Sequence, residues 1–195
     1  MQLILASSSA YRRELLQRLA LPFEAIAPDL DERPLDGESP AALARRLARQ
    51  KAEHILARHP DALVIGSDQV ADFQGVPLGK PHGFEAAHAQ LQRFSGQTVL
   101  FHTAVCVARG ERRLVDLATT ECRFLQLTDA QIRHYLQTEQ PYDVAGSAKI
   151  ERMGVALLER VRSDDPTAII GLPLIALCRL LRQCGVDPLQ PGAPS

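Results

Sequence analysis

Hydroxyl, cationic and acidic side chains recur along the first eighty residues in a combination that fits polyphosphate chemistry. Arginine and lysine neutralise phosphate charge, while carboxylates hold a divalent metal or take a proton from water. Each of these side chains alone is typical of an ordinary helix surface or turn. Together they fit one chemistry, in which cations bind a polyphosphate and carboxylates bind a metal and a water. The set comprises Ser7, Ser9, Arg12, Arg13, Glu32, Lys51, Asp68 and Lys80.

The start of the chain shows how the first members of this set would be positioned. Residues 3–6 form an apolar run that predicts a buried strand, and leucines at helical spacing follow three serines. Serine is a preferred helix N-cap, and a helix N-terminus presents free N–H groups and the positive end of its dipole. With Arg12 and Arg13 one turn in, this end would form a phosphate cradle. An ordinary capped helix with two solvated arginines is the alternative.

A second helix and a second buried strand carry Lys51 and Asp68. Ser39, followed by proline, predicts the start of a helix that runs to about residue 59. Lys51 falls on the apolar face of that helix, where it either extends to the surface or reaches an anion at a cleft wall. Residues 62–66 predict a buried strand that ends in Ser67, Asp68 and Gln69. Polar residues at the end of a buried strand are where α/β proteins place their chemistry.

The remaining pattern predicts an α/β protein with a mixed central sheet. A long hairpin is expected to extend into a second lobe and to leave a deep cleft between the lobes. We expect a single two-lobed domain over residues 1–189 and a flexible tail over residues 190–195. The further strands are expected at residues 23–27, 70–73, 76–78, 98–108, 114–125 and 154–161, and the further helices at residues 84–94, 128–141 and 173–184.

Composition excludes several classes of protein. A formal net charge of −1 argues against a large nucleic-acid interface but leaves room for a small anionic ligand. No apolar segment is long enough for a membrane span or a signal peptide. The four cysteines form no C-x-x-C pair, which favours reduced thiols and a cytoplasmic location. No glycine-rich dinucleotide fingerprint is present, and residues 75–81 resemble a P-loop that is one residue short.

Several short motifs occur together, in order, over nearly the whole chain to about residue 189. The combination resembles the Maf family of house-cleaning nucleoside triphosphate pyrophosphatases, although each piece alone is weak. The motifs are Ala6-Ser7-Ser8-Ser9-Ala10-Tyr11-Arg12-Arg13, Lys51-Ala52, Gly66-Ser67-Asp68-Gln69-Val70, Gly79-Lys80-Pro81, Ala145-Gly146-Ser147 and Gly171-Leu172-Pro173-Leu174.

The resemblance implies a two-lobed fold related to inosine triphosphate pyrophosphatases and hydrolysis between the α and β phosphates. A divalent cation, Mg²⁺ or Mn²⁺, is expected. By position, Asp68 matches the proton acceptor of the family, and Glu32 is assigned with it to metal or water binding. The match implies further polar cleft residues, and it places Lys51 and Lys80 among the catalytic ones. The others are Ser7, Ser9, Arg12 and Arg13.

Three positions depart from the pattern typical of members that act on dTTP and UTP. Tyr11 replaces an arginine, Gln69 replaces a threonine, and Glu151 lies near an expected glutamine. These residues resemble the subgroup that acts on 7-methyl-GTP, which usually carries tryptophan at the first position. A methylated guanine is cationic and is attracted to an aromatic face, and a carboxylate can accept both donors of its Watson–Crick edge. Packing of Tyr11 on its own helix and a solvated Glu151 are the alternatives.

We therefore expect a nucleotide pyrophosphatase for 7-methyl-GTP that binds a small molecule and no nucleic acid or membrane. The same reaction on GTP, a deaminated purine nucleotide or a pyrimidine triphosphate is one alternative. A non-catalytic regulator of septum formation is another, because the Maf family is associated with that process. A homodimer is a further expectation.

Overall fold

A seven-stranded mixed sheet forms the centre of the computed structural model, which describes residues 2–190. The path β2-β1-β3-β5-β6-β7 is joined by β4, which pairs with β3. The pairs β1–β2 and β1–β3 are parallel and the others antiparallel, so the predicted mixed sheet is confirmed. The strands are β1 (Leu3–Ala6), β2 (Glu24–Ile26), β3 (Leu63–Phe73), β4 (Val76–Leu78), β5 (Thr98–Arg109), β6 (Arg112–Phe124) and β7 (Leu158–Arg162).

Five α-helices begin close to the predicted starts. Ser9, Ser39 and Thr128 are the N-caps of α1, α2 and α4, and each side chain accepts a hydrogen bond from the helix backbone. The helices are α1 (Ala10–Gln17), α2 (Pro40–Leu56), α3 (Phe84–Phe94), α4 (Asp129–Glu139) and α5 (Leu174–Gln183), and the 3₁₀ turns are η1 (Ala145–Ser147), η2 (Met153–Leu157) and η3 (Ala168–Ile170).

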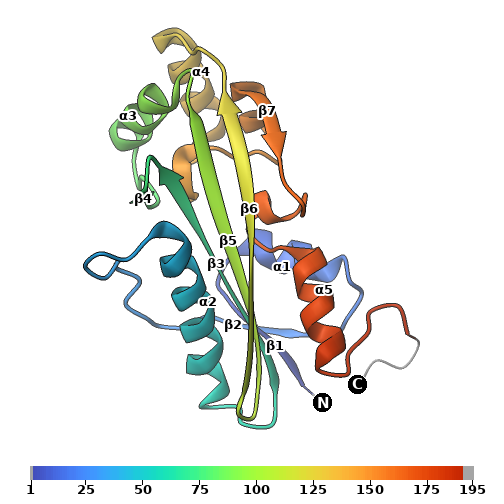
Figure 1. The fold of residues 1–195 in the computed structure, drawn as a ribbon. Helices are drawn as coiled ribbons and strands as arrows, with labels where there is room; N and C mark the ends of the chain where they lie inside the picture. Colours follow the sequence, from blue (N-terminus) through green and yellow to red (C-terminus); the bar gives the residue numbers. More distant parts are fainter. Residues whose placement is uncertain (1, 191–195) are drawn as a thin grey trace.

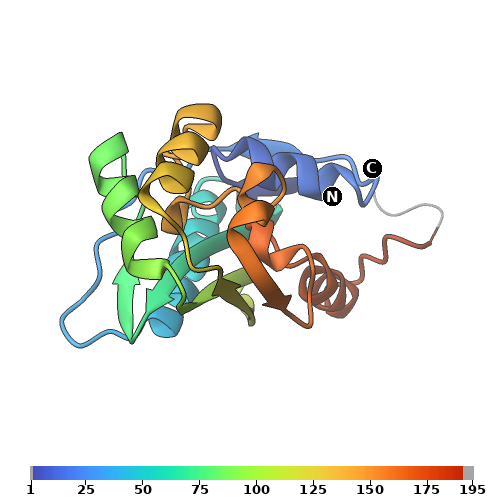
Figure 2. The same ribbon diagram turned by 90° about the horizontal axis from the view of Figure 1, so that it is seen from above.

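The helices cover the sheet unequally, as Figure 1 shows. Around the lower halves of the long strands, α2 covers one face, while α1 and α5 cover the other. Around the upper halves, α3 and α4 pack together over the face that continues from α1 and α5 (Figure 2). The sheet thus passes through both halves of the molecule, and three apolar cores flank it.

Strand β3 differs from its prediction in a way that bears on function. We predicted an end at residue 66 and a new strand at residue 70, but β3 is continuous over eleven residues because β5 pairs with it from Val64 to Asp72. On its other edge β1 pairs with β3 only as far as Gly66, and pairing with β4 begins at Ala71 of β3. Residues 67–70 therefore have no strand beside them on that edge. Asp68 lies in this gap, just past the carboxyl end of β1.

Two further predictions differ from the structure or fall beyond it. The strand predicted over residues 154–161 is wrong in its first part, because residues 153–157 turn as η2, with the N–H of Gly154 bonded to the carbonyl of Lys149. Apart from Gln190, the predicted tail lies outside the described residues, and the single domain stays a prediction. Within residues 2–190 every helix is too short or too polar to cross a bilayer.

Candidate active site

Lys51 joins two carboxylates at the gap in the sheet. Its Nζ lies 2.6 Å from Oδ1 of Asp68 and 2.8 Å from an oxygen of Glu32. Lys51 and Asp68 are buried, whereas Glu32, on the loop after β2, is half exposed. The apolar face of α2 therefore carries its lysine into a charged cluster, so the side chain does not extend to the surface, and the cleft wall of the second alternative stays a prediction.

Gly66 allows α2 to lie close enough for this contact. A Cβ atom at Gly66 would stand 2.1 Å from the carbonyl oxygen of Ala48 and 2.7 Å from the backbone nitrogen of Ala52. Only glycine leaves room for that backbone contact. The Gly66-Ser67-Asp68 sequence thus brings β3 against α2 and then presents the carboxylate to Lys51.

Arg12 reaches the same gap from α1. Ser7 and Ser9 shape its approach, since the Ser7 hydroxyl accepts from the Ser9 N–H at 3.1 Å and Ser9 caps the helix. The Arg12 Nε then donates to the Gly171 carbonyl at 2.8 Å. Burial lowers the pKa of Arg12, and the charges of Asp68 and Glu32 oppose that shift. The loop after β1, the loop after β2 and strand β3 therefore meet at one point, as expected for the carboxyl ends of parallel strands.

Lys80 joins this group and Arg13 does not. Partial burial acts to raise the pKa of Glu32, but Lys51, Lys80 and Arg12 outweigh it and leave the pKa below its ordinary value. Lys80 is exposed on the loop after β4 and reaches Glu32 through charge. Arg13 is exposed on α1, and its guanidinium pairs with no side chain in the described part of the chain.

The residues predicted to choose the base gather around Lys149, on the loop between α4 and β7. The Lys149 Nζ lies 5.9 Å from the centroid of the Tyr11 ring and 3.2 Å from Oδ1 of Asp143. Burial acts to lower the pKa of Lys149, but its contacts with Tyr11 and Asp143 raise it overall. Burial also raises the pKa of Glu151, and Lys149 opposes that shift. Tyr11 and Glu151 therefore share a neighbour, although 140 positions separate them in the chain.

Two site residues differ from expectation. Sequence reasoning missed Lys149, which only the nearby Ala145-Gly146-Ser147 motif could have indicated. Gln69 was expected to bind the base or ribose, but its Nε2 contacts the hydroxyl of Thr103 and the carbonyls of Ala168 and Ile169, each at 3.0 Å. Its amide donors thus hold η3 against the sheet. Because side chains alternate along a strand, Gln69 faces the side of the sheet that α1 covers, whereas Asp68 faces α2.

The donor set fits a divalent cation that is shared with a substrate. Mg²⁺ in enzymes is commonly held by one or two carboxylates together with substrate phosphates and water. Glu32 and Asp68 converge on one ammonium group, so their oxygens already lie near a common point. No cluster of three His, Cys, Asp or Glu side chains occurs among residues 2–190, so the phosphates would supply the remaining ligands.

Two cavities of the structure lie away from these residues, and the predicted deep cleft stays a prediction. One of about 480 Å³ lies beside α2 and β6, and another of about 430 Å³ lies near the β5–β6 turn. Neither is lined by Asp68 or Tyr11. The candidate site is therefore defined by convergent side chains.

Comparisons with known proteins agree with this assembly of motifs. Residues 2–184 match the family described as Maf-like protein. The chain is 60% identical over 188 residues to a 7-methyl-GTP pyrophosphatase of Bordetella pertussis, covering 96% of this chain and 94% of that protein. It is 57% identical over 189 residues to the protein of that name from Bordetella avium, covering 97% and 96%. A third, from Cupriavidus pinatubonensis, is 55% identical over 186 residues, covering 94% of each. The chain belongs to the Maf family.

Proposed function

We propose that this protein is an enzyme that hydrolyses 7-methyl-GTP to 7-methyl-GMP and diphosphate. The observation that carries the proposal is the buried contact of Lys51 with Asp68, which Glu32 and Arg12 approach from two other segments. Relatives named for this activity share more than half of their residues with the chain over almost its full length.

Asp68 is the proposed proton acceptor. Its Oδ1 is bound to Lys51, and no other residue in the described part of the chain donates a hydrogen bond to Oδ2. A water held at Oδ2 attacks the α-phosphorus and gives its proton to that oxygen. The bond from the α-phosphorus to the bridging oxygen breaks, and diphosphate leaves with the electron pair. The carboxylate therefore acts as a general base that α2 holds in place.

The surrounding cations stabilise the charge that moves onto the leaving group. Lys51 and Arg12 approach Asp68 from α2 and α1, and Lys80, on the loop after β4, lies close enough to Glu32 to lower its pKa. Ser7 and Ser9 orient the start of α1, whose N–H groups suit phosphate oxygens. We retain Arg13 as an outer phosphate contact because it follows Arg12 on the exposed side of α1.

Glu32 and Asp68 are the residues that would hold Mg²⁺ or Mn²⁺. When bound, such a cation neutralises phosphate charge and polarises the phosphoryl oxygen. The residues of the chain meanwhile orient the triphosphate between α1 and the loop after β4. Hard oxygen donors suit both metals, so the site supports either.

The base would lie between Tyr11 and Glu151. The positive ring of 7-methylguanine suits an aromatic face, and the Glu151 carboxylate accepts from the N1–H and N2–H groups. Lys149, held by Asp143, lies over the Tyr11 ring, with its Nζ 5.9 Å from the ring centroid. Gln69 contributes through η3, which it ties to the sheet.

The enzyme is proposed to remove modified nucleotides in the cytoplasm. Its proposed partners are the small-molecule substrate and a second copy of the chain. Four free cysteines support a reducing compartment. The buried contact of Asp68 with Lys51 supports a catalytic role over a non-catalytic role in septum formation.

A side-by-side assay of diphosphate release tests the proposal. We expect the highest kcat/KM for 7-methyl-GTP in a panel that includes GTP, ITP, UTP and dTTP. A preference of about tenfold over GTP follows from the cation–π contact of the methylated ring. The preference over UTP and dTTP follows in addition from the charge-assisted hydrogen-bond pair to Glu151, which uracil and thymine cannot form. A higher kcat/KM for UTP or dTTP would contradict the assignment of Tyr11 and Glu151.

A further inference from the structure

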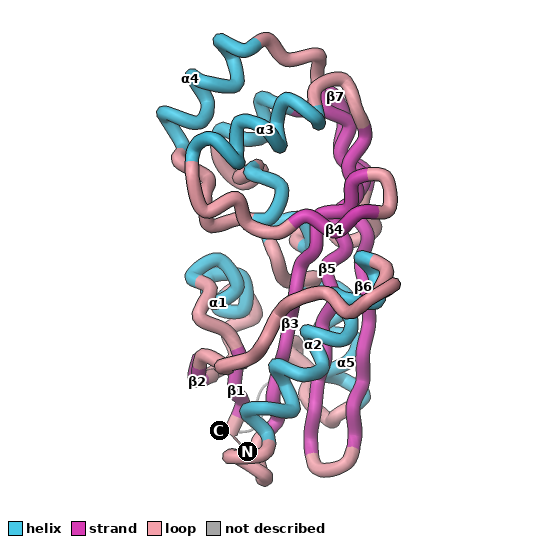
Figure 3. The backbone as a smooth tube through the Cα atoms, turned by 90° about the vertical axis from the view of Figure 1, so that its left-hand side faces the viewer, coloured by secondary structure: helices cyan, strands magenta, loops and turns pink. Residues whose placement is uncertain are grey.

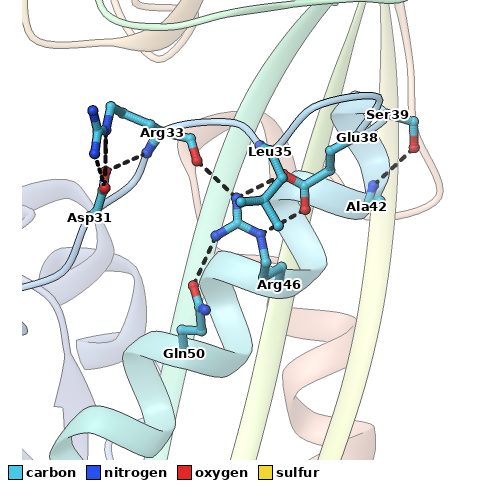
Figure 4. Close-up of polar contacts among 8 residues, drawn as sticks. All are labelled: Asp31, Arg33, Leu35, Glu38, Ser39, Ala42, Arg46 and Gln50. Carbon is cyan, nitrogen blue, oxygen red and sulfur yellow. Dashed lines mark hydrogen bonds and ion pairs between the residues drawn. The ribbon is translucent and has the colours of Figure 1, made fainter.

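Arg46 is the most fully bonded side chain on the outer surface of α2. Its Nε and Nη2 form a fork to the two carboxylate oxygens of Glu38, each at 2.7 Å. Nη2 also donates to the Arg33 carbonyl and Nη1 to Gln50, both at 3.0 Å (Figure 4). The side chains of Arg46 and Glu38 are only 20% and 10% exposed to solvent, which is low for an ion pair outside the active site.

These bonds tie down the loop that joins β2 to α2. The loop crosses in front of β3 before it reaches the start of α2 (Figure 3). It contains no strand or helix between Ile26 and Pro40, so side-chain contacts must hold it in place. Arg46 holds it at two places, the Arg33 carbonyl and the Glu38 carboxylate, and Glu38 in turn accepts from the Leu35 N–H at 3.1 Å.

The point of attachment is adjacent to Glu32. Arg33 directly follows Glu32, and Asp31 holds the Arg33 side chain away from α2 through an exposed ion pair. The Arg33 backbone carbonyl is consequently the group that Arg46 fixes. Arg46 and Lys51 lie on the same helix, five residues apart, so one rigid element binds the loop at Arg33 and at Glu32.

We infer that Arg46 is a positioning residue that holds the loop against α2 and thereby places Glu32 on Lys51 beside Asp68. The inference rests on the role given to Glu32 in the proposed function. A half-exposed glutamate on an irregular loop would otherwise lose rotamer and backbone entropy each time it entered the site. Because the fork to Glu38 already holds the loop in the folded protein, this entropy is not lost when Glu32 enters the site. A lysine could not replace it, because an ammonium lacks the planar pair of donors.

Amide hydrogen exchange of the full-length protein without substrate tests the anchoring. In Arg46→Gln we expect residues 31–38 to exchange about tenfold faster or more, with β3 unchanged. The matched control is Arg49→Gln, on the same helix, where the arginine pairs with Glu53 and contacts no part of the loop. Unchanged exchange over residues 31–38 in Arg46→Gln, or an equal rise in the control, would overturn the inference.

A kinetic cycle tests the connection to Glu32. If Arg46 acts through Glu32, Arg46→Gln lowers kcat/KM for 7-methyl-GTP in the wild type by about tenfold and has little effect in Glu32→Gln. Losses that multiply in the double variant would overturn the inference. If Glu32→Gln keeps full turnover while exchange still rises in Arg46→Gln, the role of Glu32 in the proposed function is wrong and the anchoring stands.

Discussion

The phosphate end and the base end of the candidate site are built differently. Asp68 and Lys51 lie on a central strand and on the helix packed against it, and their contact is 2.6 Å. The base end lies on an irregular segment between α4 and β7, where Lys149 and Asp143 are 3.2 Å apart and Lys149 is 5.9 Å from the Tyr11 ring centroid. The Asp68–Lys51 pair thus lies on rigid elements, whereas Lys149 and Glu151 lie on a loop, and we expect changes in that loop to alter specificity without loss of catalysis.

Helix α1 is the one element that serves both ends. Tyr11 lies beneath the Lys149 ammonium. The next residue, Arg12, donates to the Gly171 carbonyl, and the charge of Asp68 acts to raise its pKa. Successive helical residues diverge by about 100°, which is enough to face two regions. A shift of α1 would therefore disturb binding of both the base and the phosphates, whereas a change in the loop of Lys149 would disturb the base alone.

The largest expected effect is at the phosphate end. Asp68→Asn removes the proton acceptor while keeping shape and a hydrogen bond to Lys51, so kcat should fall about 10³-fold on every nucleotide. Thermal unfolding of the variant serves as the control for its fold. Turnover within a few-fold of the wild type would refute the role of Asp68.

Gly66→Ala tests the support beneath that end. The new methyl group would collide with the Ala48 carbonyl, so the free energy of unfolding should fall by about 3 kcal/mol. Turnover should fall as well, because α2 must move and Lys51 moves with it. Gly79→Ala is the matched control, since a Cβ there meets nothing within 4 Å. Equal urea denaturation midpoints for the two variants would contradict the close approach of α2 to β3.

Glu151→Gln tests the base end. The amide cannot accept two hydrogen bonds with the strength of a carboxylate, so KM for 7-methyl-GTP should rise about tenfold. The kcat value should change little, because the phosphate end is intact. Steady-state kinetics on 7-methyl-GTP and UTP decide the matter, and a loss of kcat without a change in KM would place Glu151 elsewhere in the mechanism.

A smaller effect is expected from pH. Burial raises the pKa of Glu151, so on acidification this carboxylate takes up a proton earlier than an ordinary glutamate does. The protonated form is a poorer acceptor, and KM for 7-methyl-GTP should rise several-fold between about pH 7 and pH 5. Glu151→Gln is the control, because protonation of the substrate itself affects KM equally in both proteins. Identical KM profiles in the two proteins would contradict the prediction.

Local patterns in the sequence were sufficient for the helices and for most strands. Caps at Ser9, Ser39 and Thr128 marked helix starts correctly, because an N-cap depends on neighbours within three residues. The continuity of β3 through Asp68 was missed because it depends on pairing with β5, more than thirty residues away.

The same distinction applies to the candidate site. The position of Lys51 on the apolar face of α2 could be predicted from the sequence. The direction of its side chain could not, because it depends on contacts with Glu32 and with Asp68 on β3. Lys149 and Arg46 act through partners that local periodicity does not reveal. The role of Gln69 at the base stays a prediction, and its contacts with η3 could not be foreseen because they join residues about a hundred positions apart.

The most direct test of this division between a phosphate end and a base end is the ratio of kcat/KM for 7-methyl-GTP to that for UTP, measured in the wild type, Glu32→Gln and Glu151→Gln. We expect Glu32→Gln to lower both values and preserve the ratio, whereas Glu151→Gln should lower the ratio about tenfold. A ratio that falls in Glu32→Gln, or one that survives in Glu151→Gln, would contradict this division.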